Sequence, residues 1–179
     1  MSSPSVDDIA LQVQQSIEST CAQAHAAGLS SDREWTFNIL SDLTRLGRSY
    51  GFKVRGAKPA QDDFETGWLW DLTWVDIRDW HRPDWADGKL VELPLVLESE
   101  WNVRFEDEIL WDFQKLLVAR AHLRVMIFQQ STKQAADNCL ERMRAAIKTF
   151  SETRSRDRYL FACWIFNESR TLIEDYVHS

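Results

Sequence analysis

Two glutamates separated by a single residue end a short apolar run, Leu95-Val96-Leu97-Glu98-Ser99-Glu100-Trp101. The run predicts a buried strand, and successive side chains of a strand point to opposite faces, so Glu98 and Glu100 should share a face. Carboxylates that close repel each other unless a cation, a proton or a basic side chain lies between them. A divalent metal is one such cation. The alternative is a strand that ends at the surface, with both glutamates solvated.

A third carboxylate, Asp71, lies in the middle of an aromatic and β-branched run, Trp68 to Asp76, which is typical of a strand. A carboxylate buried within a strand must be paired, hydrogen-bonded or bound to a metal. Carboxylate oxygens suit Mg²⁺, which usually takes one or two protein carboxylates and keeps several waters. Such an ion makes an attacking water more acidic and stabilises charge on a phosphate, which is the chemistry of phosphodiester hydrolysis.

A lysine on the next predicted helix can reach the same place. This helix is predicted from Arg104 to Ala121, and its apolar stripe is Phe105, Ile109, Phe113, Leu116 and Leu117. At about 100° per residue, Asp112 projects at one edge of the stripe, and Lys115 lies about 60° further round on the same flank. Lys115 can therefore reach back under the helix. An ordinary Asp112–Lys115 ion pair at i, i+3 is the alternative.

The elements that must position these residues alternate between helix and strand. Amphipathic periodicity predicts two N-terminal helices, over residues 6–27 and from Ser31 to about Leu46, and Ser31 with Glu34 forms a capping box. Strands are predicted over residues 50–56, 68–76, 95–101, 123–130 and 159–166. Ser131 is predicted to cap a helix whose apolar stripe is Ala136, Leu140, Met143, Ile147 and Phe150.

This order predicts an α/β fold, with a central mixed β-sheet that has helices on both faces. Nothing in the composition marks a domain boundary, so we expect a single domain over residues 1–179. We also expect the strands that contain Asp71 and Glu98 to be neighbours in the sheet. Residues 168–179 read as a polar tail with no predicted element.

The arrangement resembles the PD-(D/E)XK nuclease superfamily, which has the restriction-endonuclease-like fold. The resemblance covers residues 32 to about 130, which are predicted to form a helix, three strands, a crossover helix and a further strand. Asp71 lies on the second of these strands, and Glu98-Ser99-Glu100 lies on the third. The resemblance implies a DNA endonuclease in which Asp71, Glu98, Glu100 and Lys115 are catalytic. It also implies that Asp71, Glu98 and Glu100 bind Mg²⁺ or Mn²⁺.

Glu100 departs from the family pattern, because that position is usually a lysine. At least one member of the superfamily ends the strand in Glu-x-Glu, and others place the lysine on the following helix, where Lys115 lies. In this arrangement Glu100 accepts a proton from the attacking water or helps to hold a second ion, and Lys115 orients the water or the phosphate. The residues alone leave both roles of Glu100 open.

Composition and charge restrict the partners. The chain has 179 residues and a net charge of −7, which argues against nonspecific coating of nucleic acid, because that binding depends on neutralising phosphates. A local basic groove for DNA stays possible, with a solvated helix face as the alternative. Basic residues gather in two clusters, first Arg45, Arg48, Lys53, Arg55 and Lys58, then Arg142, Arg144, Lys148, Arg154, Arg156 and Arg158.

We expect a cytoplasmic protein with no membrane partner. No apolar run approaches the roughly 18–20 residues that span a membrane, and Met1 to Ser5 lack the parts of a signal peptide. The cysteines, Cys21, Cys139 and Cys163, are scattered on apolar faces and should be buried, reduced thiols.

Two other function classes compete with the nuclease. The first is a non-catalytic interaction protein on the same scaffold, such as an inhibitor or an immunity-type protein, which fits the small size and acidic charge. The second is an enzyme on an unrelated substrate, with the tryptophan-rich loop of residues 80–88, which includes His81, forming an apolar pocket. A sequence-specific nuclease of this size would need a homodimer or a protein partner, because base readout requires additional elements.

Overall fold

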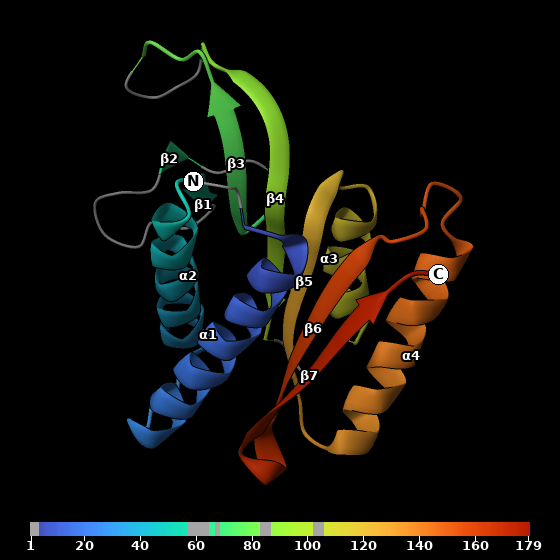
Figure 1. Ribbon diagram of the computed structural model, residues 1–179. Coiled ribbons are helices and arrows are strands. Elements are labelled where there is room, and N and C mark those ends of the chain that lie inside the picture. Colours follow the sequence, from blue (N-terminus) through green and yellow to red (C-terminus); the bar gives the residue numbers. More distant parts are fainter. Residues whose placement is uncertain (1–3, 57–64, 67–68, 83–86, 102–105) are drawn as a thin grey trace.

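The computed structural model describes residues 4–56, 65–66, 69–82, 87–101 and 106–179 (Figure 1). Its strands form one seven-stranded sheet in the order β2-β1-β3-β4-β5-β6-β7. The strands are β1 (Lys53–Gly56), β2 (Glu65–Thr66), β3 (Leu72–Arg78), β4 (Lys89–Glu100), β5 (Ala121–Gln130), β6 (Arg158–Ile165) and β7 (Arg170–Val177). The helices are α1 (Val6–Ala26), α2 (Asp32–Ser49), α3 (Glu106–Leu117), α4 (Lys133–Thr149) and the short 3₁₀ helix η1 (Phe166–Glu168).

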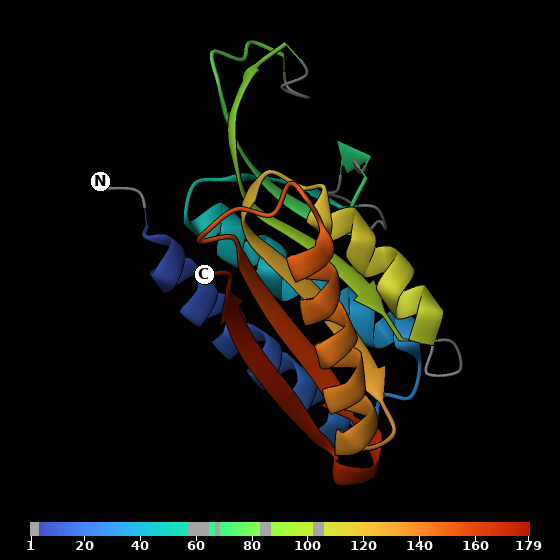
Figure 2. The same cartoon turned by 90° about the vertical axis from the view of Figure 1, so that its right-hand side faces the viewer.

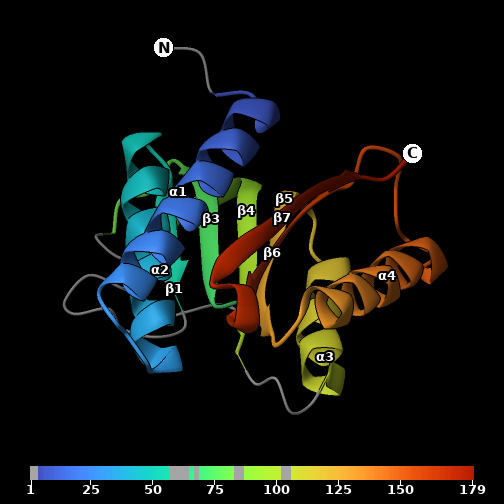
Figure 3. The same ribbon diagram turned by 90° about the horizontal axis from the view of Figure 1, so that it is seen from below.

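Helices cover both faces of the sheet. Figure 3 shows α1 and α2 on one face and α3 and α4 on the other, and in Figure 2 α4 (orange) and α3 (yellow) lie on the same side of the sheet. Alternate residues of β4 enter the two cores, since Leu95 and Leu97 pack with α1 and α2 whereas Val96 packs with α3 and α4. The predicted mixed sheet, with helices on both faces and two helices at the N-terminus, is confirmed.

The sheet combines an antiparallel meander with parallel crossovers. Strands β1, β3 and β4 pair antiparallel in sequence. Strands β4, β5 and β6 pair parallel, so α3 and α4 serve as the crossover helices between them. Leu72 of β3 lies opposite Leu97 of β4, which brings Asp71 next to the end of β4. The prediction that the segments carrying Asp71 and Glu98 are neighbours in the sheet is therefore confirmed.

Two strand predictions near the site were wrong in their bounds. Asp71 lies directly before β3 and not in the middle of it, because ladder pairing with β4 begins at Leu72. Strand β4 begins at Lys89 and not at Leu95. Its first residues are exposed and pair with the end of β3, so backbone pairing extends the strand beyond its buried, apolar part.

The later elements differ from expectation in three places. The crossover helix ends at Leu117, and Ala121 already belongs to β5. Thr132 caps α4 in place of Ser131, since its side chain accepts a hydrogen bond from the backbone N–H of Ala135. The expected polar tail contains β7, which pairs antiparallel with β6 along its whole length. Pairing with the open edge of β6 forms this strand, although its own side chains are mostly half-buried or exposed.

Two other local predictions, the Ser31 cap and the burial of the cysteines, are confirmed. Helix α2, however, continues past Leu46 to Ser49, and β1 begins at Lys53 and not at residue 50. Ser31 caps α2 by accepting from the N–H of Glu34, and its hydroxyl donates to the Glu34 carboxylate, so Glu34 has a structural role. All three cysteines are buried free thiols. In the part of the chain that the structure describes, the helices are too short or too polar to cross a membrane.

Candidate functional site

The candidate site forms where α3 packs against the end of β4. Glu98 points from β4 toward the α3 side of the sheet, and its side chain is only 2% exposed. Lys115 of α3 reaches it, with Nζ 2.7 Å from Oε2 of Glu98. The same Nζ lies 2.9 Å from Oδ1 of Asp112. Lys115 therefore makes both of the contacts that the sequence predicts as alternatives. It forms the i, i+3 ion pair with Asp112 on its own helix, and it also reaches Glu98 on the strand.

Packing fixes the helix that carries Lys115. Ile109, Phe113 and Leu116 are fully buried and hold α3 on the sheet at helical spacing. The indole N–H of Trp70 donates to the backbone carbonyl of Lys115 at 3.2 Å. Trp70 immediately precedes Asp71, so one short segment contacts both α3 and the end of β4.

Asp71 is held by the residue between the two glutamates. Its Oδ2 accepts from the backbone N–H of Ser99 at 3.0 Å and from the Ser99 hydroxyl at 2.8 Å. Both bonds use the same carboxylate oxygen, Oδ2. The carboxylate is half-buried and close enough to Glu98 for its charge to raise the pKa of Glu98.

Glu98 is the electrostatically unusual group of the site. The pKa of its carboxyl is raised to about 8, mainly by burial; the charge of Asp71 adds to the rise, and the hydrogen bond from Lys115 opposes it. Its second oxygen, Oε1, is buried and has no hydrogen-bond partner among the described residues. A buried carboxylate oxygen without a partner is costly, so this position favours either a proton or a cation.

The lysine stays charged. Burial lowers the pKa of Lys115, but its bonds to Glu98 and Asp112 raise it by more, so the net pKa lies above the usual value. A lysine ammonium between two carboxylates offsets part of their repulsion. The site therefore contains one cation of its own, on the Oε2 side of Glu98.

Glu100 lies two residues further along β4 on the same face as Glu98 and is half-buried. Within the described residues, no cluster of three or more histidine, cysteine, aspartate or glutamate side chains is arranged to hold a metal ion. The structure brings Asp71, Glu98 and Lys115 together, whereas the three-carboxylate metal set that includes Glu100 stays a prediction. Asp71 and Glu98 fit a Mg²⁺ ion that takes two protein carboxylates, because Glu98 offers an unpartnered oxygen.

Two residues that position the site, Trp70 and Ser99, have no role that the sequence predicts. Ser99 faces away from Glu98 along its own strand, and its bond to Asp71 depends on the position of the neighbouring strand. The indole of Trp70 bonds to a helix 45 residues away in sequence. No local pattern marks either contact.

The other candidate groups lie elsewhere. In the first basic cluster Arg45 pairs with Asp42, and Lys53 lies over the Trp80 ring at 4.5 Å; Lys58 lies outside the described residues. In the tryptophan-rich loop, His81 is exposed and 3.5 Å from Asp87, while residues 83–86 are outside the described part. The pocket expected at this loop therefore stays a prediction.

The second basic cluster is divided between helix and cavity. Arg142 pairs with Asp107, and Arg144 with Glu174. The last three arginines of the cluster, Arg154, Arg156 and Arg158, line a cavity far along the sheet from Glu98.

Comparisons of the chain with protein-family models, with curated proteins and with solved structures gave no match. The function is therefore inferred from the geometry around Asp71, Glu98 and Lys115.

Proposed function

We propose that the protein is a metal-dependent nuclease of the PD-(D/E)XK type, with its active site at the end of β4. One observation carries the proposal: Lys115 of the crossover helix bonds to buried Glu98 at 2.7 Å, beside Asp71 from the neighbouring strand segment. The order of elements supports it. The resemblance rests on a helix, three strands, a crossover helix and a further strand. The chain has this order in helix α2, the meander of β1, β3 and β4, the crossover helix α3 and the parallel strand β5.

Asp71 and Glu98 would hold the metal, and Glu100 is the remaining acidic group on that face of β4. A bound Mg²⁺ supplies a more acidic attacking water and stabilises negative charge on the phosphate. Lys115 would orient the phosphate or the water through its ammonium, and Glu100 would accept the proton that the water loses. Metal binding would require Glu98 to lose its proton, so affinity for the metal should rise as pH increases toward 8.

The test is cleavage of duplex and single-stranded DNA by the purified protein with millimolar Mg²⁺ or Mn²⁺. We expect cleavage that EDTA abolishes and that Asp71→Asn and Glu98→Gln each reduce by about 100-fold or more, the scale of a lost catalytic group. Glu34→Gln is the matched control, because Gln serves equally well in a capping box and Glu34 lies in α2, outside the site. Full activity in Glu98→Gln, or cleavage that persists in EDTA, would contradict the proposal.

One observation favours a second candidate, the non-catalytic interaction protein. Trp111 on α3 is 71% exposed, and Val118, the first residue after α3, is 58% exposed. Large exposed apolar side chains are typical of protein interfaces, where tryptophan contributes strongly to binding. A homodimer that contacts through α3 is the simplest form of this candidate.

Metal titration and light scattering separate the two candidates. Binding of Mg²⁺ or Mn²⁺ that Glu98→Gln abolishes supports the nuclease. The interaction protein predicts no metal binding at millimolar concentration and a wild-type dimer that Trp111→Ala converts to a monomer.

A further inference from the structure

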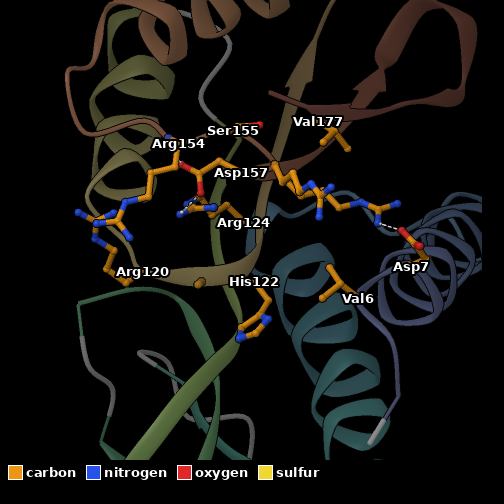
Figure 4. A pocket seen from close by; sticks show the side chains of 12 residues that line it. Val6, Asp7, Arg120, His122, Arg124, Arg154, Ser155, Asp157 and Val177 are labelled. Carbon is orange, nitrogen blue, oxygen red and sulfur yellow. Dashed lines mark hydrogen bonds and ion pairs between the residues drawn. The ribbon is translucent and has the colours of Figure 1, made fainter. Parts of the chain in front are cut away.

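A second site candidate lies at the opposite end of the parallel strands from Glu98. The cavity there has a volume of about 730 Å³ and opens where β5 and β6 begin, whereas Glu98 and Glu100 stand where β4 ends. Its walls come from four parts of the chain: residues 6–7 at the start of α1, residues 120–122 with Arg124, residues 154–158 and Val177 of β7. Figure 4 shows these side chains around the cavity.

The lining is rich in arginine. Five arginines and two aspartates contribute to it, namely Arg120, Arg124, Arg154, Arg156, Arg158, Asp7 and Asp157. Ion pairs compensate some of them, since Arg158 pairs with Asp7 and Asp175, and Arg120 pairs with Glu152.

Two guanidinium groups of the lining are not compensated. Arg154 and Arg156 are exposed, and neither side chain has an ion-pair partner in the described parts of the chain. The five arginines of the lining exceed the four carboxylates paired with them by one charge, so in a protein with a net charge of −7 the local positive charge is carried by Arg154 and Arg156. Such a concentration of cations attracts an anionic ligand.

Arg124 adds a buried donor. Its side chain is 3% exposed, and it is fixed by bonds from Nε and Nη2 to the carbonyl of Ala119, at 3.1 and 2.8 Å, and from Nη2 to Asp157 at 3.2 Å. The Tyr159 ring lies 5.1 Å from its guanidinium carbon. The remaining nitrogen, Nη1, is buried and has no hydrogen-bond partner among the described residues. Arg124 is therefore a rigid guanidinium in the wall of the cavity, with one nitrogen that is buried and has no acceptor among the described residues.

We propose that this cavity binds a small molecule through a phosphate group. The planar fork of a guanidinium matches phosphate oxygens, and the exposed Arg154 and Arg156 offer the donors, while buried Arg124 adds a fixed guanidinium to the wall. The volume lies within the range of about 300–1,000 Å³ that is usual for small-molecule sites. Val6, Ala121 and Val177 form an apolar part of the wall, which suits the organic portion of a phosphorylated ligand.

Isothermal titration calorimetry of the full chain tests this site with pyrophosphate, ADP and citrate. We expect pyrophosphate, ADP or both to bind, and the comparison of the two shows whether the ligand is inorganic or organic. Arg154→Gln with Arg156→Gln should weaken that binding about tenfold or more, as expected when a charged hydrogen bond is lost. The melting temperature should be unchanged, because neither side chain has a partner to lose.

The matched control is Arg33→Gln with Lys148→Gln, which removes the same charge from two exposed positions outside the cavity lining. This variant should bind the phosphate ligand as the wild type does. Equal weakening in the control would show a general charge effect and overturn the site. The site would also be overturned if neither pyrophosphate nor ADP bound at millimolar concentration. The same holds if citrate bound as tightly as pyrophosphate and ADP do. Binding of a DNA oligomer through Arg154 and Arg156 without binding of either phosphate would assign the surface to nucleic acid instead.

Discussion

At the scale of single residues, the central feature is a buried carboxyl with only one of its oxygens paired. Removing a carboxylate from water costs several kcal/mol of free energy, and one ion pair offsets only part of this cost. Lys115 bonds Oε2 of Glu98, while Oε1 has no partner among the described residues. Without a metal, protonation is the remaining way to lower the energy of Glu98, which agrees with its raised pKa.

This pKa predicts how stability depends on pH. In the folded protein the pKa of Glu98 rises from 4.5 to about 8, so between these values the folded chain keeps a proton that the unfolded chain has lost. The stabilising contribution of that proton is full below the unfolded pKa and is lost as pH rises through the folded pKa. Glu98→Gln has no proton to lose. The unfolding free energy of the wild type, relative to Glu98→Gln, should therefore fall by about 1–3 kcal/mol between about pH 5 and pH 8.

Urea unfolding of both proteins at the two pH values, without metal, measures this difference. A constant difference, or one that grows with pH, would mean that Glu98 is ionised throughout and that Lys115 compensates it fully.

At the scale of elements, caps and edges decide where helices and strands begin. Thr132 caps α4 although Ser131 stands beside it and has a similar hydroxyl. The backbone carbonyl of Ser131 accepts from the N–H of Asn167, so this residue is tied to the segment after β6. The neighbouring segment thus selects which of two adjacent hydroxyl residues becomes the cap.

Alanine substitution distinguishes the two residues. Thr132→Ala should lower the unfolding free energy by about 1 kcal/mol, because the N–H of Ala135 loses its acceptor. Ser131→Ala should change it by less than about 0.5 kcal/mol, since its backbone bond to Asn167 is kept. Chemical denaturation of the two variants provides the comparison, and a larger cost for Ser131→Ala would mean that the cap is misassigned.

At the scale of the whole molecule, the layer of α1 and α2 packs closely on the sheet at one glycine. A Cβ on Gly47 of α2 would lie 2.7 Å from the indole ring of Trp74 in β3. The ring is fully buried, and Tyr50 and Phe52 lie against it at centroid distances of 6.2 and 6.0 Å. Because the ring has little room to move, the helix itself would have to shift.

Gly47→Ala should therefore destabilise the protein by about 1–3 kcal/mol, even though alanine favours a helix over glycine by about 1 kcal/mol. In a Trp74→Phe background, the smaller ring leaves room for the new methyl group, so the cost of Gly47→Ala should shrink or change sign. A double-mutant cycle from thermal or urea unfolding measures this coupling. Additive effects would show that the close approach of α2 to β3 is not the cause.

Much of the fold follows from patterns within a few residues. The helical stripes, the Ser31–Glu34 cap, the apolar parts of the strands and the burial of the cysteines depend on neighbours in sequence. The described residues have them, although several element bounds differ from the prediction and Phe105 of the predicted crossover helix lies outside the described residues. The shared face of Glu98 and Glu100 follows in the same way, from the alternation of side chains along a strand. These features have a local physical cause and therefore a local signature.

The site and the edges of the sheet depend on segments far apart in the chain. Asp71 meets Ser99 across two paired strands, Lys115 meets Glu98 across a crossover, and β7 forms because β6 offers a free edge. The arginine-lined cavity joins residues from both ends of the chain. Periodicity predicts the flank of the helix on which Lys115 lies, but it does not decide the partner of such a side chain. These contacts form only when packing brings distant backbone together, and burial then sets the cost of each unpaired polar atom.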